Sequence, residues 1–441
     1  MNFFIFIVKK VLTKLAFPSI IYTLSIKMLN FHYFTRRKIM KLSTKLFALV
    51  LSIVMILGVF SLTSCNADNP AKDNDKIKIG LTGPLTGGAS IYGIAVKNAA
   101  KLAVDEINAA GGLDGILFEL EMLDDKHDAT AVENLYAELY EGGMQVSLGT
   151  VTTAPGLNFK SFANEDNVFF ITPSATGDAI PEFANGYQMC FADSNQGTAA
   201  AKFFNENYQG KKVGIFYKTD DEYSVGIYNN FKKNLDASFG DISATTASFN
   251  GDASTFDSQI QILKDCDIVF MPIYYTPASQ FMTQANGVEN SIKVYYGCDG
   301  FDGIDAIKGF DITTVPQEVS YLSHFNSTAT EGPAADFIAK YNAAYDEEKE
   351  PLNQFGAAAY DCVYAIFEAL KVAKANGKDV AANTSASDLC EILKEVFNSD
   401  SFEFRGITGK TEGNEKSHIT WIADGTVQKE AIKYIVKAAN S

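Results

Sequence analysis

Basic residues are scarce over most of this 441-residue sequence. The chain carries 53 Asp and Glu against 37 Lys and Arg, and nine of the basic residues lie within 1–64, a stretch that contains no acidic residue. Beyond it, 28 basic residues stand against 53 acidic ones, and Arg405 is the one arginine. Because phosphate binding needs a basic face, this balance excludes a nucleic-acid partner.

Cysteine and histidine are few as well. The cysteines after residue 65 are odd in number and never at C-x-x-C spacing, which favours buried thiols over a disulfide framework or a zinc site, although a pairing of Cys266 with Cys298 stays open. His127, His324 and His418 are the histidines of this region, and the chain has no G-x-S-x-G or H-E-x-x-H motif. An extracellular hydrolase is therefore disfavoured, and neither a metal nor a cofactor is expected.

Residues 40–64 have the order of a lipoprotein signal peptide. Lys41 and Lys45 precede a long apolar run, and small residues precede Cys65 in the tetrapeptide L-T-S-C. The tetrapeptide resembles the bacterial lipobox, so we expect Cys65 to be lipidated and to anchor the protein to a membrane. A plain transmembrane anchor with an incidental cysteine is the alternative.

Two segments flank this signal. Residues 1–39 form an extension that is either an over-extended start or an extra membrane segment. Residues 65–76 are polar and are expected to act as a tether ahead of the folded part.

The rest of the chain alternates short β-type runs with helical patterns. Strands are predicted at 77–81, 117–123, 145–148, 168–171, 212–217, 268–271 and 293–296, and helices at 92–110, 195–208, 223–235, 254–263 and 277–286. This order predicts an α/β fold with parallel-rich sheets, helices on both faces and two Rossmann-like lobes, since the length exceeds one such unit. The last part of the chain departs from this alternation. Helices are predicted there at 333–345, 354–375 and 385–397, and strands follow at 407–408, 419–422 and 431–436.

Loops after three early strands combine glycine with hydroxyl residues. They place Tyr92 in G-P-L-T-G-G-A-S-I-Y, Thr153 in G-T-V-T-T, and Ser174 and Thr176 in T-P-S-A-T. Open α/β sheets bind ligands at the carboxyl ends of their strands, where helix amino termini offer free N–H groups to a carboxylate. Taken singly, Thr153 and Thr176 are more typical of ordinary helix N-caps.

Three residues follow later strands in the same way. Tyr223 and Tyr274 could wall an apolar side chain, and Asp299 could pair with an ammonium group. Each also has a simpler interpretation, as core packing for the tyrosines and as a turn for Asp299-Gly300.

Taken in order, these motifs resemble the Leu/Ile/Val-binding family of type I periplasmic binding proteins. The sequence G-P-L-T-G is followed by N-A-A-G-G, G-x-x-T-T, T-P-S-A-T, D-E-Y-S-x-G, P-I-Y-Y-T-P-A-S-Q and G-C-D-G-F-D, over residues 77–433. The resemblance implies two lobes joined by three hinge crossovers, near Asp193, near Ser323 and around 408–415. Lobe 1 would then comprise 77–193 and 324–406, and lobe 2 would comprise 194–323 and 407–441.

The same resemblance implies roles for the candidate residues. Thr153, Ser174 and Thr176 would receive the α-carboxylate of an amino acid, the last two also its ammonium, and Asp299 would be the acidic partner of that ammonium. Tyr92, Tyr223 and Tyr274 would be aromatic walls. In this sequence Thr153 replaces the commoner Ser, and Asp299 stands where leucine-binding members have the longer Glu.

The function expected from this resemblance is that of a monomeric, lipid-anchored, extracytoplasmic protein. It would deliver an amino acid with a branched side chain to the permease of an ABC transporter, without a catalytic step. A sensory module of the same fold is the first alternative, disfavoured because no signalling domain follows Ser441. Another cargo, such as urea, a short amide or an aromatic amino acid, is the second.

Overall fold

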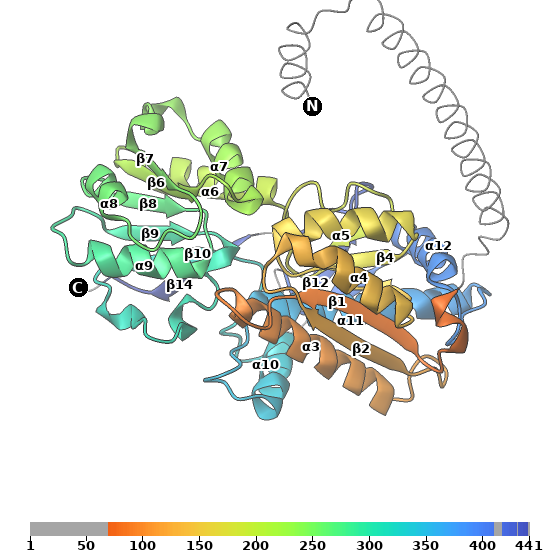
Figure 1. Ribbon diagram of the computed structural model, residues 1–441. Coiled ribbons are helices and arrows are strands. Elements are labelled where there is room, and N and C mark those ends of the chain that lie inside the picture. Colours follow the sequence, from red (N-terminus) through yellow and green to blue (C-terminus); the bar gives the residue numbers. More distant parts are fainter. Residues whose placement is uncertain (1–68, 410–416, 430, 440–441) are drawn as a thin grey trace, which may run out of the picture. The chain divides into compact units, whose positions relative to one another are not determined.

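The computed structural model describes residues 69–409, 417–429 and 431–439. The predicted signal peptide, the extension before it and the lipidation site Cys65 lie outside the described residues. Within the described part, two separate large sheets each have helices on both faces (Figure 1), which confirms the predicted two-lobed α/β fold. No helix of this part is long and apolar enough to cross a membrane.

Lobe 1 is built on a parallel sheet in the order β2-β1-β3-β4-β5. Its strands are β1 (Ile77–Gly83), β2 (Phe118–Asp124), β3 (Val146–Ser147), β4 (Phe169–Thr172) and β5 (Gly186–Gln188). Its helices are α3 (Ser90–Ala109), α4 (Val132–Glu141), α5 (Thr153–Glu165), α10 (Gly332–Ala344), α11 (Gln354–Ala375) and α12 (Ala386–Phe397). Successive side chains of a strand point to opposite faces, so Phe169 packs on Phe397 of α12 while Phe170 packs on Phe159 of α5.

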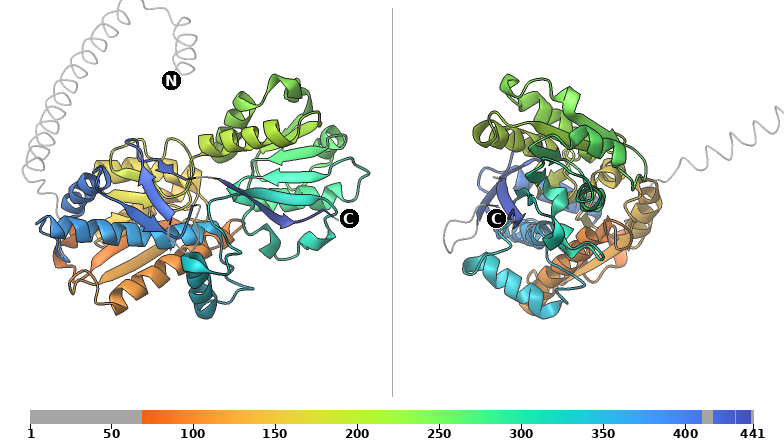
Figure 2. Two further views of the ribbon diagram at one scale, coloured as in Figure 1. Left: turned by 180° about the vertical axis from the view of Figure 1, so that it is seen from behind. Right: turned by 90° about the vertical axis from the view of Figure 1, so that its left-hand side faces the viewer.

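Lobe 2 contains a six-stranded sheet in the order β14-β10-β9-β8-β6-β7. Its strands are β6 (Val213–Lys218), β7 (Thr246–Phe249), β8 (Ile268–Met271), β9 (Val294–Gly297), β10 (Glu318–Ser323) and β14 (Ile432–Lys437), and its helices are α6 (Asp193–Asn207), α7 (Glu222–Asn234), α8 (Asp257–Leu263) and α9 (Tyr275–Ala285). Phe270 stacks on Phe231 of α7, whereas Phe216 contacts Phe281 of α9 on the other face. All pairs are parallel except β14, which runs antiparallel to β10 along one edge (Figure 2).

Short 3-10 helices complete the described elements: η1 (Pro70–Asp73), η2 (Ala129–Ala131), η3 (Ala237–Phe239), η4 (Ile242–Thr245), η5 (Asp299–Phe301), η6 (Ile304–Ala306) and η7 (Ile312–Thr314). The pairing of Cys266 with Cys298 that the sequence left open does not form, because both thiols are free and buried. No group of three or more potential metal ligands gathers among the residues described.

Most of the predicted third crossover, residues 410–415, lies outside the described residues, but the strands on either side of it are described. Strands β11 (Phe404–Gly406), β12 (Ser417–Trp421) and β13 (Val427–Gln428) form a small antiparallel sheet of their own. The Trp421 indole packs on Phe397 and donates a 2.7 Å hydrogen bond to the carbonyl of Gln188, which attaches this sheet to lobe 1. We therefore propose that the chain returns to lobe 2 only after β13, later than the predicted boundary at 407.

The crossovers meet in one place. On the proposed boundaries, the first crossover runs from β5 to α6, the second follows β10, and the third joins β13 to β14. Lys429, on the third, donates through Nζ to the carbonyl of Met189 on the first at 2.6 Å, and the Gly409 N–H donates to the carbonyl of His324 on the second at 2.5 Å. Lys429 thus joins the segment after β13 to the segment after β5, and Gly409 joins the segment after β11 to the segment after β10.

Candidate functional site

The seven residues singled out from the sequence line a single small cavity. Lobe 1 supplies Tyr92, Thr153, Ser174 and Thr176, and lobe 2 supplies Tyr223, Tyr274 and Asp299. Each follows the carboxyl end of a parallel strand, which is where such sheets present their binding loops. The cavity measures about 10 Å³, which is roughly room for one water molecule.

The lobe 1 side of the cavity consists of the start of α5 and the loop after β4. Thr152 is extended, and the helix begins at Thr153 without a side-chain cap, so the first N–H groups of α5 face the cavity region without helical partners. The Thr172 hydroxyl fixes the neighbouring loop by accepting from the N–H groups of Ser174 and Ala175 at 3.3 and 3.0 Å. Free N–H groups and the helix dipole together favour an anion here.

The lobe 2 side centres on the Asp299 carboxylate, which is buried in η5. Its Oδ1 accepts a 2.7 Å hydrogen bond from the Tyr223 hydroxyl, and that hydroxyl in turn accepts from the Gly300 N–H at 2.9 Å. The Asp299 N–H donates to Gln196 Oε1 at 3.1 Å. The second carboxylate oxygen, Oδ2, is buried and has no partner within the described structure. One oxygen is thus held in place while the other is available.

Electrostatics on this side favour a cation. Burial raises the pKa of Asp299 to about 7, and Asp302 adds to the effect, whereas hydrogen bonds from Tyr223, Gln196 and Gly300 lower it. Burial also raises the pKa of Asp193 well above its usual value, and the charge of Asp299 raises it further. No lysine or arginine is among the described residues that line the cavity, so a positively charged ligand group would supply the missing counter-charge.

Aromatic side chains close the cavity from both lobes. The Tyr92 hydroxyl of α3 donates to the Gly300 carbonyl of lobe 2 at 2.5 Å. The Tyr92 ring meets Phe355 of α11 edge to face at 5.1 Å. The Tyr274 and Tyr223 rings stack at 4.6 Å. The two lobes are therefore in contact around the site.

Several cavity residues had no signal in the sequence. Val151, Thr152, Gly300 and Phe355 also line the cavity. Phe355 lies in the first turn of α11, far along the chain, and no local motif marks it. Gly300 follows Asp299 in a dipeptide that is typical of a turn, and Val151 and Thr152 lie in the loop of Thr153 without a motif that marks them as site residues.

His127 lies beside the cavity, behind Thr152 and Tyr274. Its Nδ1 is 2.9 Å from the Thr152 hydroxyl, and its ring meets Tyr274 edge to face at 5.3 Å. Burial lowers the pKa of His127, and the nearby Lys218 charge lowers it further, so the imidazole is neutral at pH 7. Its contacts are those of an aromatic neighbour that touches residues of both lobes.

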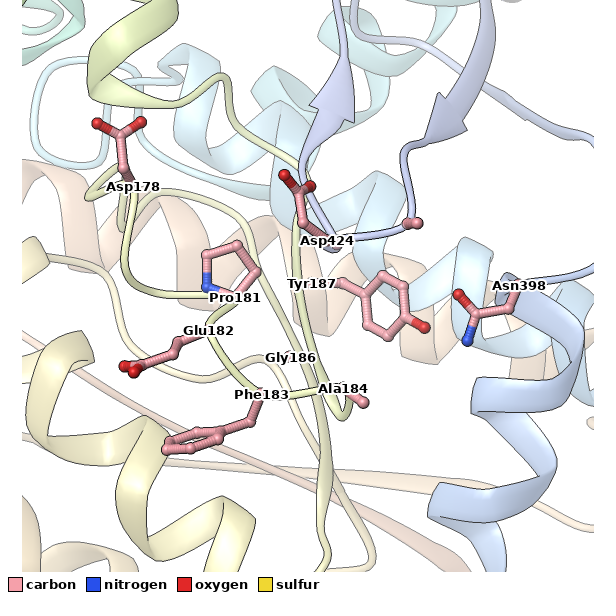
Figure 3. A pocket seen from close by; sticks show the side chains of 11 residues that line it. Asp178, Pro181, Glu182, Phe183, Ala184, Gly186, Tyr187, Asn398 and Asp424 are labelled. Atoms are coloured by element: carbon pink, nitrogen blue, oxygen red, sulfur yellow. The ribbon is translucent and has the colours of Figure 1, made fainter.

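A second hollow of about 300 Å³ lies beside the small antiparallel sheet (Figure 3). Its lining contains none of the predicted site residues. Two of its acidic side chains are already engaged, Asp178 with Ser194 and Glu182 with Lys160. This hollow therefore has no group comparable to the free oxygen of Asp299.

The chain was compared with known families and proteins. The sequence model of the family described as "Periplasmic binding protein" matches residues 76–402. The Leu/Ile/Val-binding protein BraC3 of Rhizobium johnstonii is 28% identical, with 72% of this chain and 84% of that protein covered. A leucine-, isoleucine-, valine-, threonine- and alanine-binding protein of Pseudomonas aeruginosa is 27% identical, with 70% and 81% covered.

Solved structures are similar as well. The branched-chain amino acid substrate-binding protein LivJ of Streptococcus pneumoniae, in complex with isoleucine, has a TM-score of 0.65 and 26% identity. The similarity covers 82% of this chain and 99% of that one. A leucine-binding protein LivK of Thermotoga maritima, with 23% identity and a TM-score of 0.66, shares the fold.

Proposed function

Because the chain belongs to the periplasmic binding protein family, we propose that it captures an amino acid between its two lobes and delivers it to an ABC permease. The amino acid would carry a branched aliphatic side chain, as in leucine, isoleucine or valine. The observation that carries this proposal is the pairing, across one cavity, of the partnerless Asp299 Oδ2 with the uncapped start of α5. A cation receptor opposite an anion receptor fits the two charged groups of an amino acid.

Each part of the ligand then has a partner. The carboxylate would accept hydrogen bonds from the N–H groups at Thr153 and from the hydroxyls of Ser174 and Thr176. The ammonium would pair with Asp299 and with oxygen atoms of the loop after β4. Charge-assisted hydrogen bonds of this kind are about twice as strong as neutral ones. The rings of Tyr92, Tyr223 and Phe355 would enclose the apolar side chain.

Binding would proceed by closure of the lobes about the three crossovers. Contacts such as that between the Tyr92 hydroxyl and the Gly300 carbonyl exist only when the lobes meet, so a ligand that bridges them stabilises the closed state. The printed names of the relatives support the amino-acid class. The family consists of solute-binding proteins, and the mechanism needs no covalent step.

The anchoring is also part of the proposal. Lipidation at Cys65 and the tether 65–76 would hold a monomeric binding protein at the outer surface of the membrane, within reach of its permease. Support for this anchor comes from the sequence alone, since Cys65 and the first part of the tether, up to Asp68, lie outside the residues that the structure describes.

The proposal is tested by the melting temperature of a fragment covering residues 66–441. A ligand that binds only the folded state raises the free energy of unfolding by RT ln(1 + [L]/Kd). The fragment would be screened against the twenty amino acids, urea and short amides. A rise with leucine, isoleucine or valine is expected. A rise only with another compound would replace the cargo, and a folded fragment that responds to none of them would refute the assignment of the cavity.

A further inference from the structure

His127 is held in a strained turn behind the proposed site. His127 and the preceding Lys126 both have left-handed backbone, with φ of 64° and 55°, a conformation that is uncommon for residues other than glycine. Two acidic side chains fix this turn. Asp124 Oδ1 accepts from the Lys126 N–H at 3.0 Å, and Asp125 Oδ1 accepts from the His127 N–H at 2.9 Å. Strained backbone that its surroundings hold in place is typical of functional sites, and here it fixes the position of the imidazole.

The imidazole contacts one cavity residue from each lobe. Its Nδ1 lies 2.9 Å from the Thr152 hydroxyl of lobe 1, which is a hydrogen bond in either tautomer of the ring. Its ring meets Tyr274 of lobe 2 edge to face at 5.3 Å. Thr152 and Tyr274 both line the cavity, whereas His127 does not. His127 can therefore affect the cavity through these two neighbours.

Thr152 is the N-cap residue of α5, but its hydroxyl does not cap the helix. Its backbone is extended, with φ of −116° and ψ of 155°, as is typical of an N-cap. A threonine in this position usually accepts a hydrogen bond from the N–H of the second or third helical residue. Here no side-chain cap bond forms, and the hydroxyl is bonded to His127 instead. The start of the helix is thereby left without its usual side-chain acceptor.

The start of α5 can offer few donors to an anion. The helix begins Thr153-Ala154-Pro155, and proline has no N–H. Two N–H groups, those of Thr153 and Ala154, therefore precede the first helical hydrogen bond. That bond runs from the Gly156 N–H to the Thr152 carbonyl at 3.1 Å. A capping Thr152 hydroxyl would take the Ala154 N–H, since the third position has none, and would occupy half of these donors.

We infer that His127 is a positioning residue of the proposed carboxylate receptor, which binds the Thr152 hydroxyl and so keeps the start of α5 open to the ligand. The inference rests on the proposed function. Without the imidazole nitrogen, the hydroxyl would rotate into the capping position and compete with the ligand carboxylate for the Ala154 N–H. The apparent Kd would then rise as the fraction of molecules with an uncapped α5 falls.

His127→Phe tests this role, because it keeps an aromatic ring against Tyr274 and removes the nitrogen that engages Thr152. The expected result is a Kd for L-leucine that is about two- to thirtyfold higher than in the wild type, the factor that corresponds to one N-cap interaction. Isothermal titration of the full-length chain in detergent measures this change. An unchanged or lower Kd would overturn the inference.

A second substitution should reverse the effect. Thr152→Val removes the hydroxyl and keeps the shape of the side chain, so the double variant His127→Phe/Thr152→Val has no hydroxyl at the N-cap of α5. We expect the double variant to bind L-leucine more tightly than His127→Phe alone. A merely structural role of His127 would not be rescued by the loss of a further hydrogen-bonding group. Equal or weaker binding by the double variant would therefore contradict the proposed role.

Lys126→Phe is the matched control. It places the same residue type at the neighbouring left-handed position, where the side chain is exposed and does not line the cavity. Its Kd for L-leucine is expected to equal that of the wild type. If Lys126→Phe raised the Kd as much as His127→Phe, strain in the turn would be the cause, and the role of His127 would be wrong.

A further measurement needs no ligand. Hydrogen exchange at the Ala154 amide, read by mass spectrometry with fragmentation to single residues, is expected to be slower in His127→Phe than in the wild type, because the Thr152 hydroxyl would accept from it. The double variant should return to the wild-type rate. Equal or faster exchange in His127→Phe would overturn the inference. Slower exchange, with no leucine binding to the wild type or any variant, would uphold the role of His127 and reject the proposed cargo, so the two failures are distinguishable.

Discussion

The Tyr223 hydroxyl holds one oxygen of Asp299 at 2.7 Å, and the other oxygen of the same carboxylate is buried without a partner. Burying a polar group costs free energy unless it is hydrogen-bonded. An arrangement that fixes one oxygen and leaves its twin without a partner, in a residue that lines the cavity, fits a receptor for an external donor. The ammonium of an amino acid supplies such a donor with the complementary charge.

Removal of this carboxylate is expected to abolish tight binding. Asp299→Ala should weaken the binding of L-leucine by about 2–5 kcal/mol, because a desolvated ammonium would lose its partner. Isothermal titration measures the change. Asp305→Ala, in the same lobe but at an exposed position, serves as the control and should bind like the wild type. Unchanged affinity in Asp299→Ala would remove Asp299 from the site.

The affinity should depend on pH through the same group. Its pKa of about 7 in the ligand-free protein means that a proton must leave before the ammonium can pair. Below pH 7 this proton competes with the ligand, and above pH 7 it does not. We expect L-leucine to bind about tenfold more weakly at pH 6 than at pH 8, as one proton of linkage requires. Equal affinities at the two pH values would contradict the assignment.

The stability of the ligand-free protein should follow pH in the opposite sense. The pKa of Asp299 is raised from about 3.9 in the unfolded chain to about 7 in the folded protein. Its contribution is therefore fully present below pH 4 and is lost as the pH rises through 7. Asp299→Asn, which removes the charge and keeps the shape, should melt higher than the wild type at pH 8, with the gap closing towards pH 5. A gap that does not change with pH would speak against a buried, titrating carboxylate.

The lipid anchor can be tested apart from ligand binding. Cys65→Ser removes the thiol that would be acylated, so the protein should move from the membrane fraction to the soluble fraction. Fractionation followed by immunoblotting measures this, with Cys390→Ser as the control, since that thiol is buried in α12. Retention of Cys65→Ser in the membrane would indicate an uncleaved amino-terminal helix instead of a lipoprotein.

Strands and helices could be predicted from the sequence where apolar residues follow the pattern that burial imposes on that element. The runs at 77–81 and 268–271 became β1 and β8 because strands buried on both faces are nearly continuous apolar runs. Helices were expected between the strands, but no bounds were predicted for α4 and α5. The α5 sequence carries Pro155 and Gly156 near its start, and its apolar residues do not form a clean stripe, so it is held by tertiary packing more than by its own pattern.

The lobe to which the small antiparallel sheet belongs could not be predicted from the sequence pattern. Whether β12 and β13 belong to lobe 1 or lobe 2 depends on the contacts of Trp421 with residues far away in sequence, and no local spacing reports such contacts. The site residues also fall into two groups, those that the sequence pattern located and those that it did not. Residues that follow strands could be located from strand ends, whereas Phe355 reaches the cavity from a helix more than 50 residues beyond Asp299.

Trp421 is the one tryptophan of the chain, and its position makes it an intrinsic optical probe. Its indole N–H binds the carbonyl of Gln188, the residue before Met189, whose own carbonyl accepts from Lys429 at the third crossover. The cavity does not include this ring. Any change in tryptophan emission when a ligand is added would accordingly signal rearrangement at the hinge, and quenching by direct contact with the ligand need not be considered.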